Sequence, residues 1–378
     1  MAVSKTVSEA STARIILYGV GALGSLVMRV LRSDYPTIKI VGAVDSDPMK
    51  AGRRLQDLFP DNLGIEGIMI SGTLKGCLAS LEDGTDVALH MTESKPAAIE
   101  DQLRELLEAG INVVSAAESM FHPSLRHAEF TRRLHELAVS RGVSITGAGI
   151  NPGYIFDAVP LTLARATSGV TAITLTRAID VTGTGPGDIE HVGYGLWPDE
   201  FRQKIAAGSI VGHMGMPESI ALLAERLNID IDAIEEHWET ETASFPVDSG
   251  DVSLGILEPG RVVGIRQFAE GKRGAQTIIS MSLIMYYQPE KFGIEVADRI
   301  DIVGAHHVQA SLVPAALSLF GAANMIVNCV HDALAAPAGF ANVLNFGMGG
   351  ANRSGFTYVL AGDDAARPGR LALAKSAL

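Results

Sequence analysis

The sequence predicts an α/β protein that combines a Rossmann dinucleotide-binding domain with a second, α+β domain whose sheet is mainly antiparallel. Three observations support this fold class. A glycine-rich motif follows the first apolar run, predicted strands and helices alternate over the first part of the chain, and long strands follow one another after that part. At 378 residues the chain is long enough for two domains, since domains typically span about 100–200 residues.

The first element is the apolar run at residues 14–18, which leads through a G-x-G-x-x-G motif into a predicted helix at residues 22–32. Gly19 permits the tight turn, Gly21 lets the backbone approach a pyrophosphate, and Gly24 lets the helix pack closely on the strand. The N-terminus of the helix then faces the phosphate charge. The sequence therefore predicts a nicotinamide-type dinucleotide site that includes the whole motif: Gly19, Val20, Gly21, Ala22, Leu23 and Gly24.

The second apolar run, Ile38–Val44, is predicted to be a strand and ends at Asp45. Asp45 follows the motif by about 20 residues, the spacing of the acid that accepts a hydrogen bond from a ribose 2′-hydroxyl. Its charge would repel a 2′-phosphate, which favours NAD. Ser46 and Arg53 could nevertheless accommodate that phosphate, so the expected cofactor is NAD or NADP, with NAD favoured.

Predicted helices and strands continue to alternate after Asp45, as expected for a parallel sheet covered by helices on both faces. The helix at 96–109 has Leu103, Leu106 and Leu107 at helical spacing and stops at Gly110. The next helix is capped by Ser124 and stops at Gly142. The full set comprises helices at 49–59, 74–81, 96–109 and 124–141, and strands at 65–70, 87–91, 112–117 and 143–146.

The second half of the chain changes from this alternation to long strands. We expect strands at 171–180, 261–268 and 275–287, the last two joined as a hairpin, and helices at 154–166, from near residue 218, and at 321–334. The dinucleotide-binding domain should therefore comprise residues 12–152 and about 318–345. Residues 153–317 should form a domain for substrate binding and dimerisation, and residues 346–378 a C-terminal tail.

Composition excludes several classes of function. The formal net charge is −13 and the densest basic spots are only pairs, which argues against binding nucleic acid. No apolar run approaches the roughly 18 residues that a membrane span requires, and residues 1–13 do not resemble a signal peptide. Cys77 and Cys329 form neither a disulfide framework nor a C-x-x-C motif. We expect a cytoplasmic protein that binds neither nucleic acid nor membrane.

The residues that could carry chemistry follow the predicted strands, because open α/β sheets bind ligands at the carboxyl ends of their strands. Thr92 and His90 lie at the end of one strand and could line the nicotinamide ribose, although His90 also suits a core position. Glu118 follows the next strand and could shuttle a proton, unless it is simply a solvated loop residue. The next strand leads into the segment Asn151, Pro152, Gly153 and Tyr154.

Two segments make the chain resemble a known family. They are Asn-Pro-Gly at 151–153 with the following Asp157, and the helix at 324–330 with Ala-Ala-Pro-Ala-Gly at 335–339. Together with Glu118 and the glycine motif, they resemble the dihydrodipicolinate-reductase-like group that contains 2,4-diaminopentanoate dehydrogenase and the native NAD(P)H-dependent amine dehydrogenases. The resemblance implies an enzyme that interconverts an amine with a carbonyl compound plus ammonia. We also expect a homodimer, formed through the sheet of the second domain.

The resemblance also implies residue roles. Glu118 matches the catalytic glutamate, which would deprotonate or hold ammonia and the amine intermediate. Asn151 matches a pocket residue beside the cofactor and the substrate, and Arg177 and His213 match pocket positions in the second domain. An arginine at that position could pair with a substrate carboxylate. No metal is expected.

The chain departs from the pattern of this group near its expected site. Ala117 and Ser119 flank Glu118 where many members have a cysteine and an acid, and Ile179 stands where an asparagine is expected. These departures favour a less polar amine or ketone over a diamino acid.

Two alternatives to an amine dehydrogenase remain open. A carbonyl or semialdehyde reductase of the same fold would need no ammonia, and a sensor would bind NAD(H) without turnover. Dihydrodipicolinate reductase activity is not expected: His306-His307 resembles its histidine pair, but Val308 follows and the accompanying lysine is absent.

Overall fold

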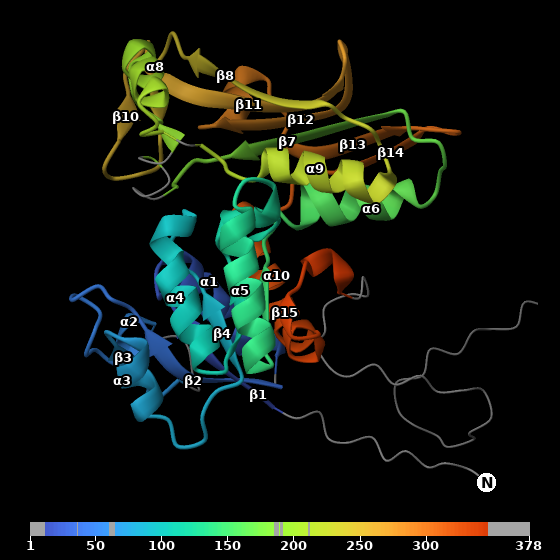
Figure 1. Cartoon of the computed structure of the whole chain (residues 1–378). Coiled ribbons are helices and arrows are strands. Elements are labelled where there is room, and N and C mark those ends of the chain that lie inside the picture. The colour runs from blue at the N-terminus through green and yellow to red at the C-terminus, as the bar shows by residue number, and fades with distance from the viewer. Residues whose placement is uncertain are drawn as a thin grey trace, which may run out of the picture.

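The molecule contains two large β-sheets that lie one above the other, with helices between and around them (Figure 1). The computed structural model describes residues 12–35, 37–59, 65–184, 189, 192–210 and 212–346. The predicted C-terminal tail, residues 346–378, therefore lies outside the described residues except for Phe346.

The first sheet, called here the parallel sheet, has seven strands in the order β15-β6-β5-β4-β1-β2-β3. All of its strand pairs are parallel. Six of them have the order of a Rossmann fold, which confirms the predicted fold of this part of the chain. The strands are β1 (Ala13–Tyr18), β2 (Ile38–Val44), β3 (Ile70–Ser71), β4 (Val87–His90), β5 (Asn112–Ser115), β6 (Ser144–Gly147) and β15 (Gly339–Phe340).

Helices cover both faces of the parallel sheet. The last of them, α10, comes from the far end of the sequence and buries Ile326, Val327 and Val330 in one core with Leu17 and Val27. It is fixed to the N-terminal part by the Tyr35 hydroxyl, which donates to Asn328 Oδ1 at 2.6 Å. These helices are α1 (Ala22–Asp34), α2 (Leu55–Leu58), α3 (Leu74–Ala79), α4 (Pro96–Glu108), α5 (Ala128–Arg141) and α10 (Ser318–Ala335).

The second sheet, called here the mixed sheet, has six strands in the order β14-β13-β7-β12-β11-β8. Only β7 and β12 pair in parallel, so the predicted, mainly antiparallel character is confirmed. The strands are β7 (Ala172–Asp180), β8 (Ala233–Thr242), β11 (Val262–Arg273), β12 (Gln276–Tyr286), β13 (Ala297–Val303) and β14 (Val308–Leu312). A separate pair is formed by β9 (Val247–Asp248) and β10 (Ile256–Leu257).

Helices α6 (Val159–Ala164) and α9 (Met216–Leu227) lie on the side of the mixed sheet that faces the parallel sheet (Figure 1). Their apolar residues pack with the inner face of the sheet into one core. A further helix, α8 (Pro198–Ala206), lies near β10 at one end of the mixed sheet (Figure 1). Short 3-10 turns complete the chain: η1 (Glu118–Met120), η2 (Pro123–Leu125), η4 (Pro289–Phe292) and η5 (Val343–Asn345).

Several predicted elements differ from the observed ones. The helix expected at 49–59 shrinks to α2, because Gly52 adopts a φ of +83° and Arg54 forms a β-bridge with Met69. Of the strand expected at 65–70, only Met69, in that bridge, and Ile70, in β3, pair with another segment. The strand β3 itself is Ile70–Ser71. Tertiary pairing thus replaces the local pattern in this part of the chain.

Two helix starts and one helix type also differ from the prediction. Pro123 begins the 3-10 turn η2, so α5 starts only after His127, and Ser124 does not cap it. The helix expected at 154–166 is a π-helical turn, η3 (Tyr154–Ala158), followed by α6. The helix α10 begins at Ser318, three residues earlier than the Gly321 predicted.

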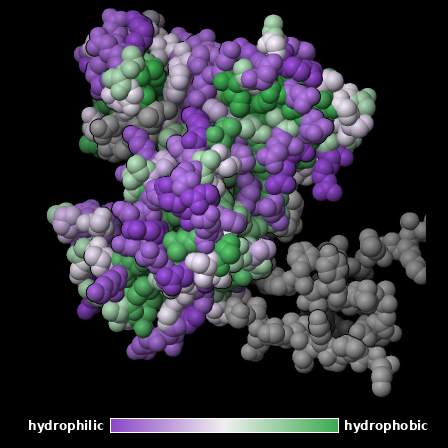
Figure 2. All heavy atoms as spheres, in the orientation of Figure 1, coloured by the Kyte–Doolittle hydropathy of each residue, from purple (hydrophilic) through white to green (hydrophobic). Residues whose placement is uncertain are grey.

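Hydrophilic residues cover most of the face seen in Figure 2, and hydrophobic residues form separate patches there. In the part of the chain that the structure describes, no helix combines the length and the apolar character needed to cross a membrane.

The core of the mixed sheet contains a buried ion pair. Arg177 on β7 and Asp298 on β13 lie in register, and their side chains are 1% and 0% exposed. The Arg177 guanidinium donates to Asp298 Oδ1 at 2.6 Å, to the Ala316 carbonyl at 2.6 Å and to Ser318 Oγ at 3.1 Å. Asp298 Oδ2 accepts from the Ala316 N–H at 2.8 Å. Both charges are therefore compensated without solvent.

Arg177→Met should lower the free energy of unfolding by about 3–5 kcal/mol, because it leaves the Asp298 carboxylate buried without a cation. Urea unfolding followed by circular dichroism measures this change. The matched control is Arg299→Met on β13, whose partner Glu295 is exposed, and we expect less than about 1 kcal/mol there. Equal losses in the two variants would contradict a special role for the buried pair.

Candidate functional site

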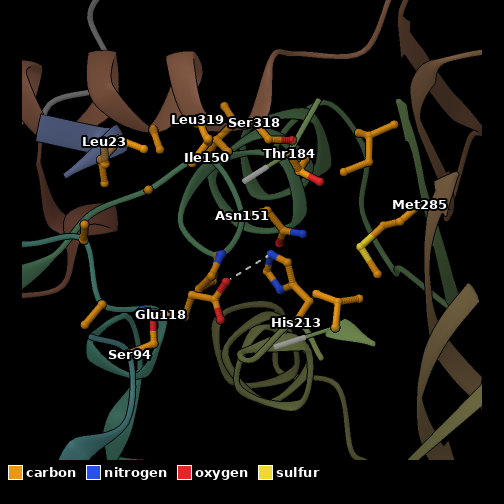
Figure 3. A pocket seen from close by; sticks show the side chains of 18 of the residues that line it. Leu23, Ser94, Glu118, Ile150, Asn151, Thr184, His213, Met285, Ser318 and Leu319 are labelled. Atoms are coloured by element: carbon orange, nitrogen blue, oxygen red, sulfur yellow. Dashed lines mark hydrogen bonds and ion pairs between the residues drawn. The ribbon is translucent and has the colours of Figure 1, made fainter. Parts of the chain in front are cut away.

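A cavity of about 460 Å³ lies between the carboxyl ends of the parallel strands and the inner face of the mixed sheet. Its wall on one side is the glycine-rich turn and the segments after β4, β5 and β6. On the other side it is lined by β7, β12, the start of α10 and the loop before α9. Figure 3 shows Glu118, Asn151 and His213 pointing toward one another within it.

The glycine-rich turn between β1 and α1 forms part of the cavity wall. Gly19 has a φ of +98°, and a Cβ there would lie 2.4 Å from the Met91 carbonyl oxygen, so no other residue fits. A Cβ on Gly24 would lie 2.9 Å from the Gly19 carbonyl oxygen. A Cβ on Gly21 would meet nothing within 4 Å, which leaves space for a ligand. Gly21, Ala22 and Leu23 line the cavity, and no side chain of the described residues caps α1, so the helix end suits a phosphate.

Asp45 lies beside this turn, as its position after β2 predicts. Its Oδ2 accepts from the Val20 N–H at 3.0 Å and from Lys50 Nζ at 3.0 Å, and its Oδ1 accepts from the Asp47 N–H at 3.0 Å. Partial burial opposes ionisation, but the hydrogen bonds from Asp47, Val20 and Lys50 hold the pKa of Asp45 below its usual value. The turn, the uncapped helix and this carboxylate together fit a dinucleotide.

Lys50 is a residue that the sequence analysis missed. Its ammonium group pairs with the very carboxylate expected to select NAD. Ser46 and Arg53, predicted to accommodate a 2′-phosphate, are exposed in the same segment and do not line the cavity. A lysine five positions after the acid was the available signal, but only the fold of the loop brings the two together.

His90 lies behind the cavity rather than in it. It is fully buried and does not line the cavity, unlike Thr92. Its Nδ1 lies 2.9 Å from Ser115 Oγ, and its Nε2 lies 2.8 Å from Gln102 Oε1 and 3.0 Å from Thr92 Oγ1. The predicted direct contact of His90 with the cofactor therefore does not fit its place in the fold, where it supports Thr92.

Glu118 follows β5 and opens the turn η1, so the strand delivers its carboxylate into the cavity. Oε2 accepts from the Met214 N–H at 3.0 Å, and Oε1 lies 3.5 Å from His213 Nε2 (Figure 3). The side chain of Glu118 is 25% exposed and that of His213 is 18% exposed. A carboxylate with an imidazole beside it, partly screened from solvent, can hold an amine and exchange a proton with it.

The segment after β6 contributes Asn151 and Pro152 to the cavity wall. Asn151 is 9% exposed, and its Nδ2 has no hydrogen-bond partner among the residues that the structure describes, so a donor is left for a ligand. Gly153 and Tyr154, predicted to contact substrate, do not line the cavity. The Gly153 N–H instead donates to Asp157 Oδ2 at 2.8 Å, and complete burial raises the pKa of Asp157 to about 7.

The wall opposite Glu118 is mostly apolar. It includes Ile179, Leu283, Met285 and Leu319, and also Arg177. Among the described lining residues Arg177 is the only lysine or arginine, and its guanidinium is already bound by Asp298, Ala316 and Ser318. The carboxylate-binding role expected for it is therefore not supported by its contacts.

No group of three or more His, Cys, Asp or Glu side chains with metal-binding geometry occurs within the described ranges.

Comparison with known proteins gives a family match over residues 154–360, to the 2,4-diaminopentanoate dehydrogenase C-terminal domain. A curated 2,4-diaminopentanoate dehydrogenase from Acetoanaerobium sticklandii is 26% identical over 333 residues, which cover 88% of this chain and 92% of that protein. The family match confirms the resemblance indicated by the sequence motifs.

Among solved structures, the amine dehydrogenase from Mycobacterium smegmatis is similar in fold, with a TM-score of 0.77 and 24% identity, covering 89% of this chain and 96% of that one. The scyllo-inositol dehydrogenase from Lactobacillus casei gives a TM-score of 0.52 at 10% identity, over 90% of this chain and 91% of that one. The fold is thus shared with dehydrogenases of different substrates.

The burial of His90 predicts a pH effect on stability. Burial lowers the pKa of His90 to about 4 from an ordinary value of 6.5, so the folded state keeps the ring neutral while the unfolded chain binds a proton. The contribution of neutral His90 is complete above pH 6.5 and is lost as the pH falls toward 4. Between pH 7 and 4.5 the wild type should lose about 2–3 kcal/mol more than His90→Gln.

Urea unfolding of both proteins at the two pH values measures this difference, in which the titration of all other groups cancels. A stability difference that stays constant with pH would show that His90 is not held neutral by the fold.

Proposed function

The chain belongs to the 2,4-diaminopentanoate dehydrogenase family, and from this premise we propose that it is an NAD(P)-dependent amine dehydrogenase. In the oxidative direction an amine loses a hydride from its nitrogen-bearing carbon to become an iminium ion. Water then converts the iminium ion to a carbonyl compound and ammonium. Reductive amination is the same sequence in reverse. A bound nicotinamide dinucleotide would supply or accept the hydride.

The observation that carries this proposal is that Glu118 shares one cavity with the glycine-rich turn. Ammonium is not nucleophilic, so attack on a carbonyl carbon needs a base within reach. Glu118 can accept that proton and return it to the hydroxyl group that leaves as water when the carbinolamine becomes an iminium ion. The regenerated carboxylate then faces the positive iminium ion and stabilises it. In the oxidative direction Glu118 would take a proton from the substrate ammonium or from the attacking water.

The residues at the turn would hold the cofactor in this scheme. Gly19, Gly21 and the start of α1 would bind the pyrophosphate, Asp45 the adenosine ribose, and Thr92 the region of the nicotinamide ribose. This arrangement would direct the hydride-accepting carbon toward the space beside Glu118 and Asn151.

For the substrate we propose an amine or ketone without a carboxylate near the reacting carbon. The contacts that occupy Arg177 and the apolar side chains of Ile179, Leu283 and Met285 support this class. Asn151 Nδ2 would donate to a carbonyl, hydroxyl or ether oxygen of such a molecule. The curated relative is named for a diamino acid, and this chain would differ from it in that respect.

The remaining expectations from the sequence stay predictions. They are a homodimer, a cytoplasmic location, use of NADP beside NAD, and the division into a dinucleotide-binding domain of residues 12–152 and 318–345 and a domain of residues 153–317 for substrate and dimer contacts. The two alternatives are a carbonyl reductase and an NAD(H) sensor with the same fold. The following experiment distinguishes both from an amine dehydrogenase.

The purified protein should oxidise NADH with small ketones or aldehydes only when concentrated ammonium is present, because the proposed reduction acts on an iminium ion. A panel of carbonyl compounds, measured with and without ammonium near pH 9, tests this. Glu118→Gln should lower the ammonium-dependent rate by about 100-fold or more and leave NADH affinity nearly unchanged. Glu93→Gln, at another residue lining the cavity, is the matched control.

Oxidation of NADH that does not need ammonium would indicate a carbonyl reductase instead. Binding of NADH without turnover on any compound of the panel would favour the sensor. A normal rate in Glu118→Gln would remove that residue from the mechanism.

Cofactor preference should depend on Asp45 and Lys50 in opposite ways. Because the Asp45 carboxylate repels a 2′-phosphate and Lys50 attracts one, Asp45→Ala should reduce the preference for NADH, and Lys50→Met should increase it, each by about 10-fold (about 1.4 kcal/mol). Fluorescence titration of each variant with NADH and NADPH gives the ratio of Kd values. Tighter binding of NADPH than of NADH by the wild type would overturn the preference for NAD.

A further inference from the structure

Gln267 is a buried polar residue outside the cavity that nonetheless holds the loop beside Glu118. It lies on β11 and is 1% exposed. Its Oε1 accepts from the His213 N–H at 3.1 Å, and its Nε2 donates to the His213 carbonyl oxygen at 2.8 Å. One side-chain amide therefore pairs with both backbone groups of a single residue, as a neighbouring β-strand would.

The direction of this amide is fixed by a second acceptor. Nε2 also lies 3.4 Å from Glu236 Oε1 on β8, so the NH₂ group must face Glu236 and the His213 carbonyl together. Glu236 in turn lies 3.9 Å from Arg126, whose guanidinium donates to Glu218 at 2.7 and 2.9 Å. Glu236, Arg126 and Glu218, with His213 itself, are the charged or titratable side chains in this network around Gln267.

The loop that Gln267 holds begins at a position that only glycine can occupy. A Cβ on Gly212 would lie 1.4 Å from the Trp238 ring, and Gly212 has a φ of +61°, so this position depends on glycine. The next two residues carry the contacts to Glu118: the Met214 N–H and the His213 imidazole. The position of these two contacts is therefore set by the amide of Gln267.

The imidazole of His213 is also held in one tautomer. Its Nδ1 lies 3.0 Å from the Met214 carbonyl oxygen, which only accepts, so Nδ1 carries the hydrogen. In the neutral ring Nε2 is then an acceptor, and it faces Glu118 Oε1, a second acceptor, at 3.5 Å. A donor with two N–H groups, such as an amine or ammonium, satisfies both acceptors at once.

We propose that Gln267 is a positioning residue for proton transfer at the amine site. Through the backbone of His213 it keeps the Met214 N–H bonded to Glu118 Oε2 and keeps His213 Nε2 facing Glu118 Oε1. An amine nitrogen can then donate to both Nε2 and Oε1. The inference rests on the proposed function, since it concerns the amine that Glu118 binds. Gln267 itself touches neither substrate nor cofactor.

The test compares Gln267→Glu with Gln267→Leu and with the control Gln276→Glu, an exposed glutamine at the start of β12. When protonated, the introduced carboxyl can accept from the His213 N–H and donate to its carbonyl oxygen, as the amide does. When ionised, it places an acceptor against that carbonyl oxygen and a negative charge beside Glu236. Its effect on the amine site should therefore grow with pH.

The measured quantities are kcat and KM for ammonium and for the ketone, from pH 6 to 10, with NADH affinity and thermal unfolding for each variant. In Gln267→Glu, kcat/KM for ammonium should approach the wild-type value at the acid end and fall about 10–100-fold below it at the alkaline end. Gln267→Leu should be lowered at every pH. Ketone KM and NADH affinity should change less than about 3-fold, and Gln276→Glu should match the wild type throughout.

A second readout does not depend on turnover. The ¹⁵N signals of the His213 ring, identified by their loss in His213→Gln, should report the Nδ1–H tautomer in the wild type without cofactor, and a mixture of tautomers in Gln267→Leu. A wild-type tautomer ratio in Gln267→Leu, or a loss of activity in Gln267→Glu that is the same at every pH, would overturn the inference. A wild type that needs no ammonium would instead overturn the proposed function.

Discussion

The site depends on one constraint: a carboxylate must be held at the carboxyl edge of the parallel sheet by a neutral donor and not by a cation. Glu118 meets it because its firm hydrogen bond comes from a neutral N–H, that of Met214, on the segment before α9. A lysine or arginine at this distance would hold the carboxylate more strongly but would also compete with an ammonium substrate. A neutral donor fixes the carboxylate and leaves its negative charge for the amine.

The same contact joins the two sheets across the cavity. A second contact of opposite direction lies nearby, where Arg126 next to η2 donates both of its bonds to Glu218 on α9. The parallel-sheet side thus supplies an acceptor, the Glu118 carboxylate, and a cation, the Arg126 guanidinium, and α9 with its preceding loop supplies their complements. Because both contacts end on one short stretch, residues 213–218, a shift of α9 would disturb the carboxylate and the cavity together.

Sequence reasoning identified the parts of the site that local patterns determine. The glycine motif, Asp45 and Glu118 each follow an apolar strand, and parallel strands bring their carboxyl ends to one edge, so their proximity could be inferred without coordinates. Gln267 and Lys50 could not be found this way. Gln267 occupies an alternating strand position like any other polar residue, and its partner His213 is 54 positions away in the chain. The helix predicted at 49–59 was wrong for the same reason: Arg54 pairs with Met69, and no pattern within residues 49–59 indicates that contact.

The buried cation determines what the cavity can accept. A substrate carboxylate at Arg177 would have to share the guanidinium with Asp298, which is fully buried and also accepts from the Ala316 N–H. A second carboxylate added beside the intact pair would place an uncompensated negative charge in an apolar wall, at a cost of several kcal/mol. Discrimination among ligands then depends on shape against Ile179, Leu283 and Met285. It also depends on Asn151 Nδ2 and Thr184 Oγ1, which have no hydrogen-bond partner among the described residues. Apolar contacts of this kind separate homologous ligands by only about 1–3 kcal/mol per methylene, so this wall discriminates weakly among molecules that differ by one methylene.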